Sequence, residues 1–168
     1  MQAPPLIELD ETFVLDGWRA GDAAAHRAFA EDAAAARFLG WTVEEARARP
    51  DSHYVRVVQQ FEHDWIAGSR LSLAIRRRAT GEAVGAVELR PLGDTAEVSY
   101  LVASELRGRA LAPRALNALL EWARRELSLR RAFLHCHVEN VASQRVAAKC
   151  GFTLTGRDGD ELRFSRDL

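Results

Sequence analysis

The strands are predicted from apolar residues that alternate with polar ones. Leu71, Leu73 and Ile75 alternate in this way, which is typical of a strand with one buried face. Residues 80–82 and residues 91–94 carry glycine or proline and predict turns, so the middle strands form an antiparallel meander. We expect strands at residues 12–15, 71–75, 84–89, 96–102, 132–138, 152–155 and 161–165.

Two helices in the C-terminal half are predicted from apolar residues at helical spacing and from glycine stops. The strongest helix spans residues 111–127, where one apolar stripe is formed by Leu116, Leu119, Leu120, Ala123 and Leu127. A shorter helix spans residues 141–150 and ends at Gly151. With one crossover helix in this half, the order of elements predicts a single α+β domain over residues 1–168.

The region between the first two strands is predicted to hold two helices. The first spans residues 22–39, with Asp22 as its N-cap and Gly40 as its stop. Thr42 and Glu45 form a capping-box pattern that begins the second helix, which the proline at position 50 interrupts before it resumes.

Composition and charge limit which partners and which cellular setting the chain can have. The chain of 168 residues is 48% hydrophobic and 28% charged, with a formal net charge of −1, so it lacks a field that would attract nucleic acid. No apolar run approaches the ~20 residues of a membrane span, and residues 1–5 lack the features of a signal peptide. Cys136 and Cys150 cannot form a disulfide framework, which predicts a reduced, cytoplasmic protein.

A short basic loop follows the predicted strand at residues 96–102. It comprises Arg107, Gly108, Arg109, Ala110, Leu111 and Ala112, and a long helix begins there. Unpaired N–H groups at a helix N-terminus, with two arginines before them, can bind a phosphate or pyrophosphate. The loop is neither a Walker loop nor a Gly-x-Gly-x-x-Gly fingerprint. A solvated basic loop that only caps a core helix is the alternative interpretation.

A second segment, residues 140–152, favours the phosphate-binding interpretation of the loop over the solvated one. It reads Asn-Val-Ala-Ser-Gln-Arg-Val-Ala-Ala-Lys-Cys-Gly-Phe, and together with the basic loop it resembles the GNAT acyl-CoA N-acetyltransferase superfamily. The similarity is greatest to the branch that holds the ribosomal-protein N-terminal acetyltransferases. The resemblance implies a mixed, mostly antiparallel sheet of about seven strands with flanking helices, whose fourth and fifth strands part to admit pantetheine.

The resemblance also assigns roles to single residues. It implies that the loop from Arg107 to Ala112 binds acetyl-CoA, together with the backbone N–H groups of Leu101 and Val102. Glu97 matches the general base of the histone-acetylating branch, with an ordinary strand glutamate as the alternative.

Three positions of residues 140–152 lie where the family binds the pantetheine arm or protonates the departing CoA thiolate. The family's usual tyrosine acid falls at Ala147, so Ser143 becomes the candidate acid, or else a plain residue of the helix start. Asn140 is expected both to cap this helix and to bind the pantetheine arm.

Several points stay open at the level of sequence. The loop has Ala110 where the family has glycine, which costs ~1 kcal/mol or more if that backbone is left-handed. His135 and His137 share one strand face, but no metal-ligand pattern accompanies them, so no metal is expected. The sequence predicts direct transfer from acetyl-CoA to an amine acceptor, either a peptide N-terminus or a small molecule. The alternative is a CoA-binding or sensing domain without turnover.

Charge and assembly leave two further expectations. Six acidic residues are expected to form a local patch beside the acceptor: Glu31, Asp32, Glu44, Glu45, Glu62 and Asp64. Neither a nucleic acid nor a membrane is expected as a partner, and a homodimer is left open.

Overall fold

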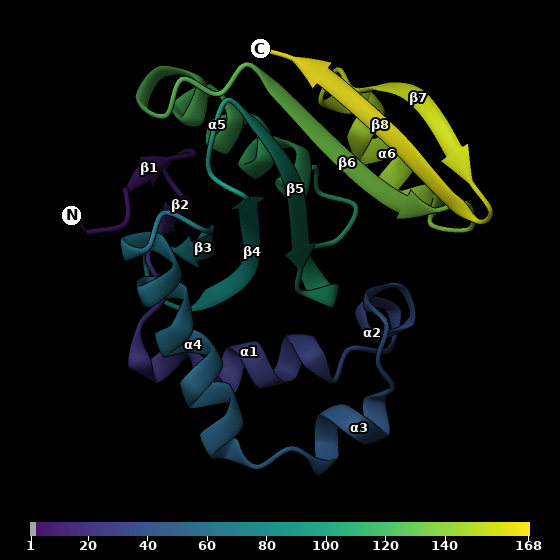
Figure 1. Cartoon of the computed structure of the whole chain (residues 1–168). Helices are drawn as coiled ribbons and strands as arrows, with labels where there is room; N and C mark the ends of the chain where they lie inside the picture. Colours follow the sequence, from purple (N-terminus) through teal and green to yellow (C-terminus); the bar gives the residue numbers. More distant parts are fainter. Residues whose placement is uncertain (1–2) are drawn as a thin grey trace.

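The computed structural model describes residues 3–168 and contains one eight-stranded sheet in the order β1-β2-β3-β4-β5-β6-β8-β7 (Figure 1). Its strands are β1 (Ile7–Glu8), β2 (Phe13–Asp16), β3 (Leu71–Arg77), β4 (Ala83–Arg90), β5 (Thr95–Val102), β6 (Arg131–His137), β7 (Thr153–Asp158) and β8 (Glu161–Asp167). Its helices are η1 (Ala20–Asp22), α1 (Ala23–Ala30), α2 (Ala33–Leu39), α3 (Val43–Ala48), α4 (Asp51–Ile66), η2 (Ser104–Leu106), α5 (Leu111–Glu126) and α6 (Val141–Lys149). The prediction about a signal peptide concerned residues 1–5. Of these, Met1 and Gln2 lie outside the described residues.

The predicted α+β class is confirmed, with one more strand than expected because β1 has only two residues. All pairings are antiparallel except the parallel pair β5–β6. Within residues 3–168, no helix combines the length and the apolar character needed to cross a membrane.

Strand β3 is buried on both faces, not on one face as its alternation predicts. Leu71, Leu73 and Ile75 are fully buried in the main core, which also contains the apolar stripe of α5. Side chains of the other face, including Ser72 and Arg76, are buried as well. They lie there because the segment before α1 covers that face through hydrogen bonds to both residues.

The position that matters most for the site is the boundary between β5 and β6. These parallel strands pair only from Thr95–Arg131 to Glu97–Phe133. Beyond Glu97, β5 runs on to Val102 without β6 beside it, whereas it stays paired with β4 as far as Gly85–Val102. The expected parting of these two strands is confirmed.

The N-terminal helices differ from the prediction in one respect. The single helix expected over residues 22–39 is two helices, because Asp32 leaves the helical conformation and caps α2 by accepting a hydrogen bond from the Ala35 N–H at 2.8 Å. Asp22 occupies the N-cap position of α1, as predicted, but its side chain accepts no hydrogen bond from the first turn of α1. The stop at Gly40, the capping box of α3 and the break at Pro50 are confirmed.

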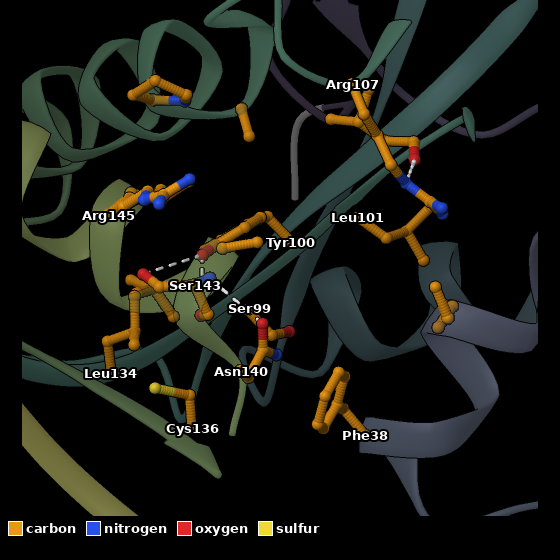
Figure 2. A pocket seen from close by; sticks show the side chains of 18 of the residues that line it. Phe38, Ser99, Tyr100, Leu101, Arg107, Leu134, Cys136, Asn140, Ser143 and Arg145 are labelled. Atoms are coloured by element: carbon orange, nitrogen blue, oxygen red, sulfur yellow. Dashed lines mark hydrogen bonds between the residues drawn. The ribbon is translucent and has the colours of Figure 1, made fainter. Parts of the chain in front are cut away.

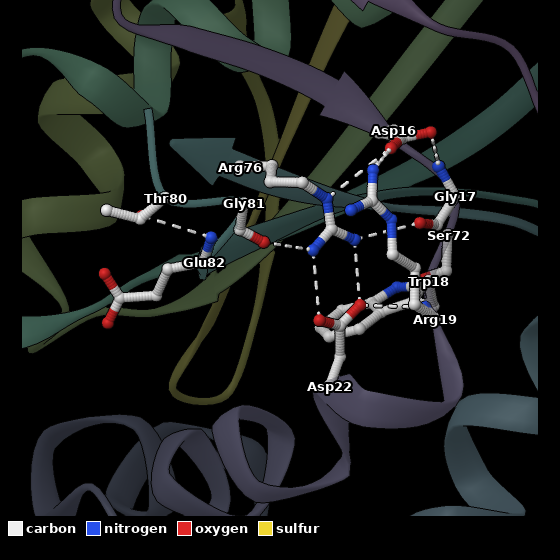
Figure 3. A network of polar contacts seen from close by, with 10 residues as sticks. All are labelled: Asp16, Gly17, Trp18, Arg19, Asp22, Ser72, Arg76, Thr80, Gly81 and Glu82. Atoms are coloured by element: carbon white, nitrogen blue, oxygen red, sulfur yellow. Dashed lines mark hydrogen bonds and ion pairs between the residues drawn. The ribbon is translucent and has the colours of Figure 1, made fainter. Parts of the chain in front are cut away.

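Asp22 instead belongs to a buried polar network around Arg76 (Figure 3). The Arg76 side chain is 3% exposed, and its two terminal nitrogens lie 3.0 and 2.8 Å from the Asp22 carboxylate. The same nitrogens donate to the carbonyls of Gly81 and Gly17, and Nε lies 3.5 Å from Asp16 Oδ2. This network fixes the start of the helical region against β3.

His26 on α1 generates a prediction about stability. Burial, together with the nearby charges of His53 and Arg70, lowers the pKa of His26 from 6.5 to about 4. Between these values the unfolded chain binds a proton that the folded chain does not, so the free energy of unfolding falls as pH falls from 6.5 towards 4. The fall reaches up to about 3 kcal/mol. Urea unfolding at pH 4.5, 5.5 and 7 measures it.

The contribution of His26 is isolated by His26→Leu. This variant is expected to lose most of that pH dependence, whatever its stability at pH 7. His63→Gln, at an exposed position of α4, is the matched control and should keep the wild-type slope. An unchanged slope in His26→Leu would contradict the assignment.

Candidate active site

The parting of β5 and β6 leaves a cavity of about 890 Å³, which is also bordered by α2, the basic loop and α6 (Figure 2). Ten of the eleven residues predicted as site residues line it: Glu97, Leu101, Val102, Arg107, Gly108, Ala110, Leu111, Ala112, Asn140 and Ser143. Arg109 does not line it and is exposed at the loop surface. The structure therefore brings together residues that lie up to 46 positions apart, from Glu97 to Ser143.

The backbone of β5 presents polar groups to this opening. The Ala103 N–H donates to the Val84 carbonyl of β4, and amide directions alternate along a strand, so the Leu101 N–H also faces β4. The Leu101 carbonyl also faces β4, because its oxygen lies 2.6 Å from the position that a Cβ atom would take at Gly85. Val102 faces the opposite way, towards the opening. Of the two predicted amides, only that of Val102 is therefore directed at the cavity.

The basic loop begins α5 in a strained conformation. Ala110 is left-handed, with φ of 57° and ψ of 20°, and Gly108 also has a positive φ of 76°. The backbone at position 110 is therefore left-handed, which the sequence left open. Alanine occupies here a region that glycine adopts without cost.

The two arginines of the loop are placed differently. Arg107 turns back, with its Nε donating to the Val102 carbonyl at 3.1 Å and a terminal nitrogen 2.7 Å from Asp32 Oδ1. Arg109 makes no hydrogen bond or ion pair with any of the residues 3–168.

A hydroxyl pair joins the two sides of the opening. Ser143 Oγ on α6 lies 2.8 Å from the Tyr100 hydroxyl of β5, and the two side chains point toward each other in Figure 2. The Ser143 N–H donates to Asn140 Oδ1 at 3.1 Å, which confirms Asn140 as the N-cap of α6. Burial raises the pKa of Tyr100 well above its usual 10, so the phenol stays protonated at neutral pH.

Sequence reasoning missed Tyr100. It looked for a phenol only at Ala147, which is buried in α6. A signal was present, because Tyr100 follows Ala96 and Val98 on the buried face of the strand. A tyrosine on such a face needs a hydrogen-bond partner for its hydroxyl.

On the opposite face of the sheet lies Glu97. Its Oε1 is 3.6 Å from an Arg90 nitrogen and 3.6 Å from His135 Nδ1. Arg163 Nε donates to His135 Nε2 at 3.2 Å, so a neutral His135 carries its proton on Nδ1, towards Glu97. This carboxylate thus lies in a partly exposed polar setting at the edge of the cavity.

The remaining polar expectations have mixed outcomes. His135 and His137 share one face of β6 and Cys136 the other, as predicted. In the described part of the chain, no three histidine, cysteine, aspartate or glutamate side chains are grouped so as to hold a metal ion. Two basic residues of α6 that the sequence analysis passed over, Arg145 and Lys149, also line the cavity.

None of the six acidic residues of the expected patch lines the cavity, and arginines or backbone groups hold four of them. Glu31 lies 2.7 Å from Arg27 Nε, and Asp64 is paired with Arg70. Asp32 is bound by Arg107, and Glu45 closes the capping box of α3. Glu44 and Glu62 are exposed and make no ion pair within residues 3–168.

The parted sheet, the basic loop at a helix start and the hydroxyl pair form a cleft that suits an extended, phosphate-bearing ligand. The comparison with family models identifies the family to which the chain belongs. Residues 12–153 match the acetyltransferase (GNAT) domain, so the chain belongs to this family. Enzymes of this family use acetyl-CoA as their co-substrate.

Individual relatives agree with this membership. A ribosomal-protein-serine acetyltransferase of Escherichia coli K12 is 35% identical over 68 residues, and the match spans only 40% of this chain and 38% of that protein. The fold is similar to RimL, a ribosomal L7/L12 α-N-protein acetyltransferase solved with CoA, with a TM-score of 0.84, 20% identity and 98% of both chains covered. It is also similar to the microcin C7 self-immunity acetyltransferase MccE solved with acetyl-CoA and AMP, with a TM-score of 0.81, 19% identity, and 95% and 94% covered.

The strained loop residue yields a prediction about stability. Ala110→Gly should stabilise the protein by about 0.5–1 kcal/mol, because glycine relieves the left-handed strain but adds disorder to the unfolded chain. Thermal unfolding should then shift upward by about 1–4 °C. Ala118→Gly, in the middle of α5, is the control and should lower the midpoint. A fall of similar size in Ala110→Gly would contradict this reading of the loop.

Proposed function

We propose that this single-domain protein moves the acetyl group of acetyl-CoA directly to a primary amine, with the α-amine of a protein N-terminus as the preferred acceptor. One observation carries the proposal: the opening between β5 and β6 has the Ser143–Tyr100 pair on one face of the sheet and Glu97 on the other. Donor and acceptor can therefore meet from opposite sides. Two buried, free cysteines support a reduced, cytoplasmic setting.

Acetyl-CoA binding would use three parts of the cavity. The Val102 N–H would donate to the pantetheine arm or to the thioester carbonyl, where it would also stabilise the oxyanion of the tetrahedral state. Backbone N–H groups at the start of α5 would bind the pyrophosphate. Arg109, Arg145 and Lys149 supply positive charge for the phosphates, and none of them has an ion-pair partner within residues 3–168.

The reaction then needs one base and one acid. Glu97 first takes the proton of the acceptor ammonium and passes it to solvent, which frees the lone pair of the nitrogen. The neutral amine then attacks the thioester carbonyl, the C–N bond forms, and Glu97 takes the proton that the nitrogen loses. The C–S bond breaks, and Ser143 hydrogen-bonds or protonates the leaving sulfur. Either hydroxyl of the 2.8 Å pair can be the donor. In the proposed mechanism Tyr100 donates to Ser143 Oγ, which leaves the serine hydrogen free to point at the thiolate. No covalent intermediate with the enzyme forms.

Two observations favour a peptide acceptor over a polyamine. The relative that matches over part of its length is a ribosomal-protein-serine acetyltransferase. Arginines hold Glu31 and Asp32, two of the acidic residues of the helices beside the opening, which weakens the attraction for a polycation. Release of free thiol from acetyl-CoA against a panel of N-terminal peptides, polyamines and other small amines tests the proposal. Turnover with polyamines alone would contradict the preferred acceptor, and binding without turnover would favour a sensing domain.

Glu97→Gln tests the base. The variant should lower kcat by about 10²- to 10⁴-fold, because the amine loses its proton acceptor, while the affinity for acetyl-CoA stays the same. Steady-state kinetics and calorimetry measure the two quantities. Glu126→Gln, at the exposed end of α5, is the matched control and should match wild type. Wild-type turnover in Glu97→Gln would return this residue to an ordinary strand glutamate.

The hydroxyl pair generates a separate prediction. Ser143→Ala should lower kcat by about 10- to 100-fold, because the thiolate leaves with limited help and the dipole of α6 remains. Tyr100→Phe removes one hydrogen bond and should cost about 3- to 10-fold in kcat. The double variant should be no slower than Ser143→Ala if the two hydroxyls act in series. Additive losses would show that they act independently, and wild-type rates would remove both from the mechanism.

A further inference from the structure

Helix α2 crosses the acceptor side of the opening and is held at both ends. It lies below the ends of β5 and β6 in Figure 1, and Ala34, Ala35, Phe38 and Leu39 line the cavity. Its first turn is tied to the loop that follows β5, and its last turn to the loop that follows β6. The helix thus connects the two strands where they are no longer paired with each other.

The first tie is the guanidinium of Arg107. It contacts the Val102 carbonyl and the Asp32 carboxylate at once, at 3.1 and 2.7 Å (Figure 2 shows the first of these contacts). Asp32 also accepts the capping hydrogen bond of α2. Burial alone would raise the pKa of the Asp32 carboxyl, but the hydrogen bonds from Arg107 and from the Ala35 N–H lower it overall, so the pair stays ionised at neutral pH.

The second tie lies at the other end of the helix. Arg37 is 2.6 Å from Glu139, which follows β6. The ring of Phe38 lies 6.1 Å from the ring of His137. Both members of the Arg37–Glu139 pair are more than half exposed, so this tie is weaker than the one at Asp32.

We propose that Arg107 is a positioning residue for the acceptor, which holds α2 against the end of β5 through Asp32 and so shapes the wall that receives the amine. The inference rests on the proposed function of this cavity. It changes the role that family resemblance gives to the first arginine of the loop, because two of its N–H groups are already used away from the phosphate side. Arg109 is then the arginine of the loop left for the phosphates.

Asp32→Asn is the cleanest test, because asparagine still caps α2 but loses the charge that binds Arg107. The variant should raise KM for the acceptor by about 3- to 10-fold, with kcat and the Kd of acetyl-CoA changed less than 2-fold. Arg107→Gln should do the same, and the double variant should be no worse than either single variant. Arg109→Ala is the matched control and should weaken acetyl-CoA binding while the acceptor KM holds.

Residue-resolved hydrogen exchange gives a readout that needs no turnover. In Asp32→Asn and Arg107→Gln, backbone amides of α2 should exchange about 3- to 10-fold faster, while those of α3 stay unchanged. Unchanged exchange in α2 would overturn the proposal even if the enzyme is active. A loss of acetyl-CoA affinity in Arg107→Gln equal to that of Arg109→Ala, with acceptor KM unchanged, would also overturn it. Faster α2 exchange in a protein that acetylates no amine would instead contradict the proposed function.

Discussion

The parting of β5 and β6 after Glu97 is the constraint on which the rest of the site depends. Backbone N–H and C=O groups inside a protein are costly when unpaired, and the end of β5 leaves such groups facing a cavity. The fold supplies partners for some of them, since Arg107 binds the Val102 carbonyl. The Val102 N–H is left for a ligand. In the proposed function, the extended arm of acetyl-CoA provides the acceptor that β6 does not.

Arginines hold the N-terminal helices at the distance that this opening requires. Arg76 fixes the start of the helical region through a buried pair with Asp22, and Arg107 fixes the start of α2 through Asp32. Removing one partner of a buried pair typically costs about 3–5 kcal/mol, because the other charge is left without compensation. The exposed Arg37–Glu139 pair contributes little to stability by comparison. These contacts set where the acceptor wall lies relative to the sheet.

Local signals in the sequence predict most elements, and contacts between distant residues explain what it misses. The capping box at Thr42 is a local pattern and was recognised, whereas the break at Asp32 lies within alanines that suit one continuous helix. Site residues within the family motifs were predicted. The pairing of Tyr100 with α6, the turning of Arg107 towards Asp32 and the left-handed Ala110 depend on the folded arrangement, so sequence spacing could not place them.

Hydrogen exchange at two neighbouring amides of β5 tests the central claim most directly. The Leu101 N–H faces β4 and should exchange slowly with or without ligand, whereas the Val102 N–H faces the opening and should exchange much faster in the free protein. Saturating acetyl-CoA should slow exchange at Val102 and leave Leu101 unchanged. Equal protection of both amides in the free protein, or no effect of acetyl-CoA at Val102, would contradict the account.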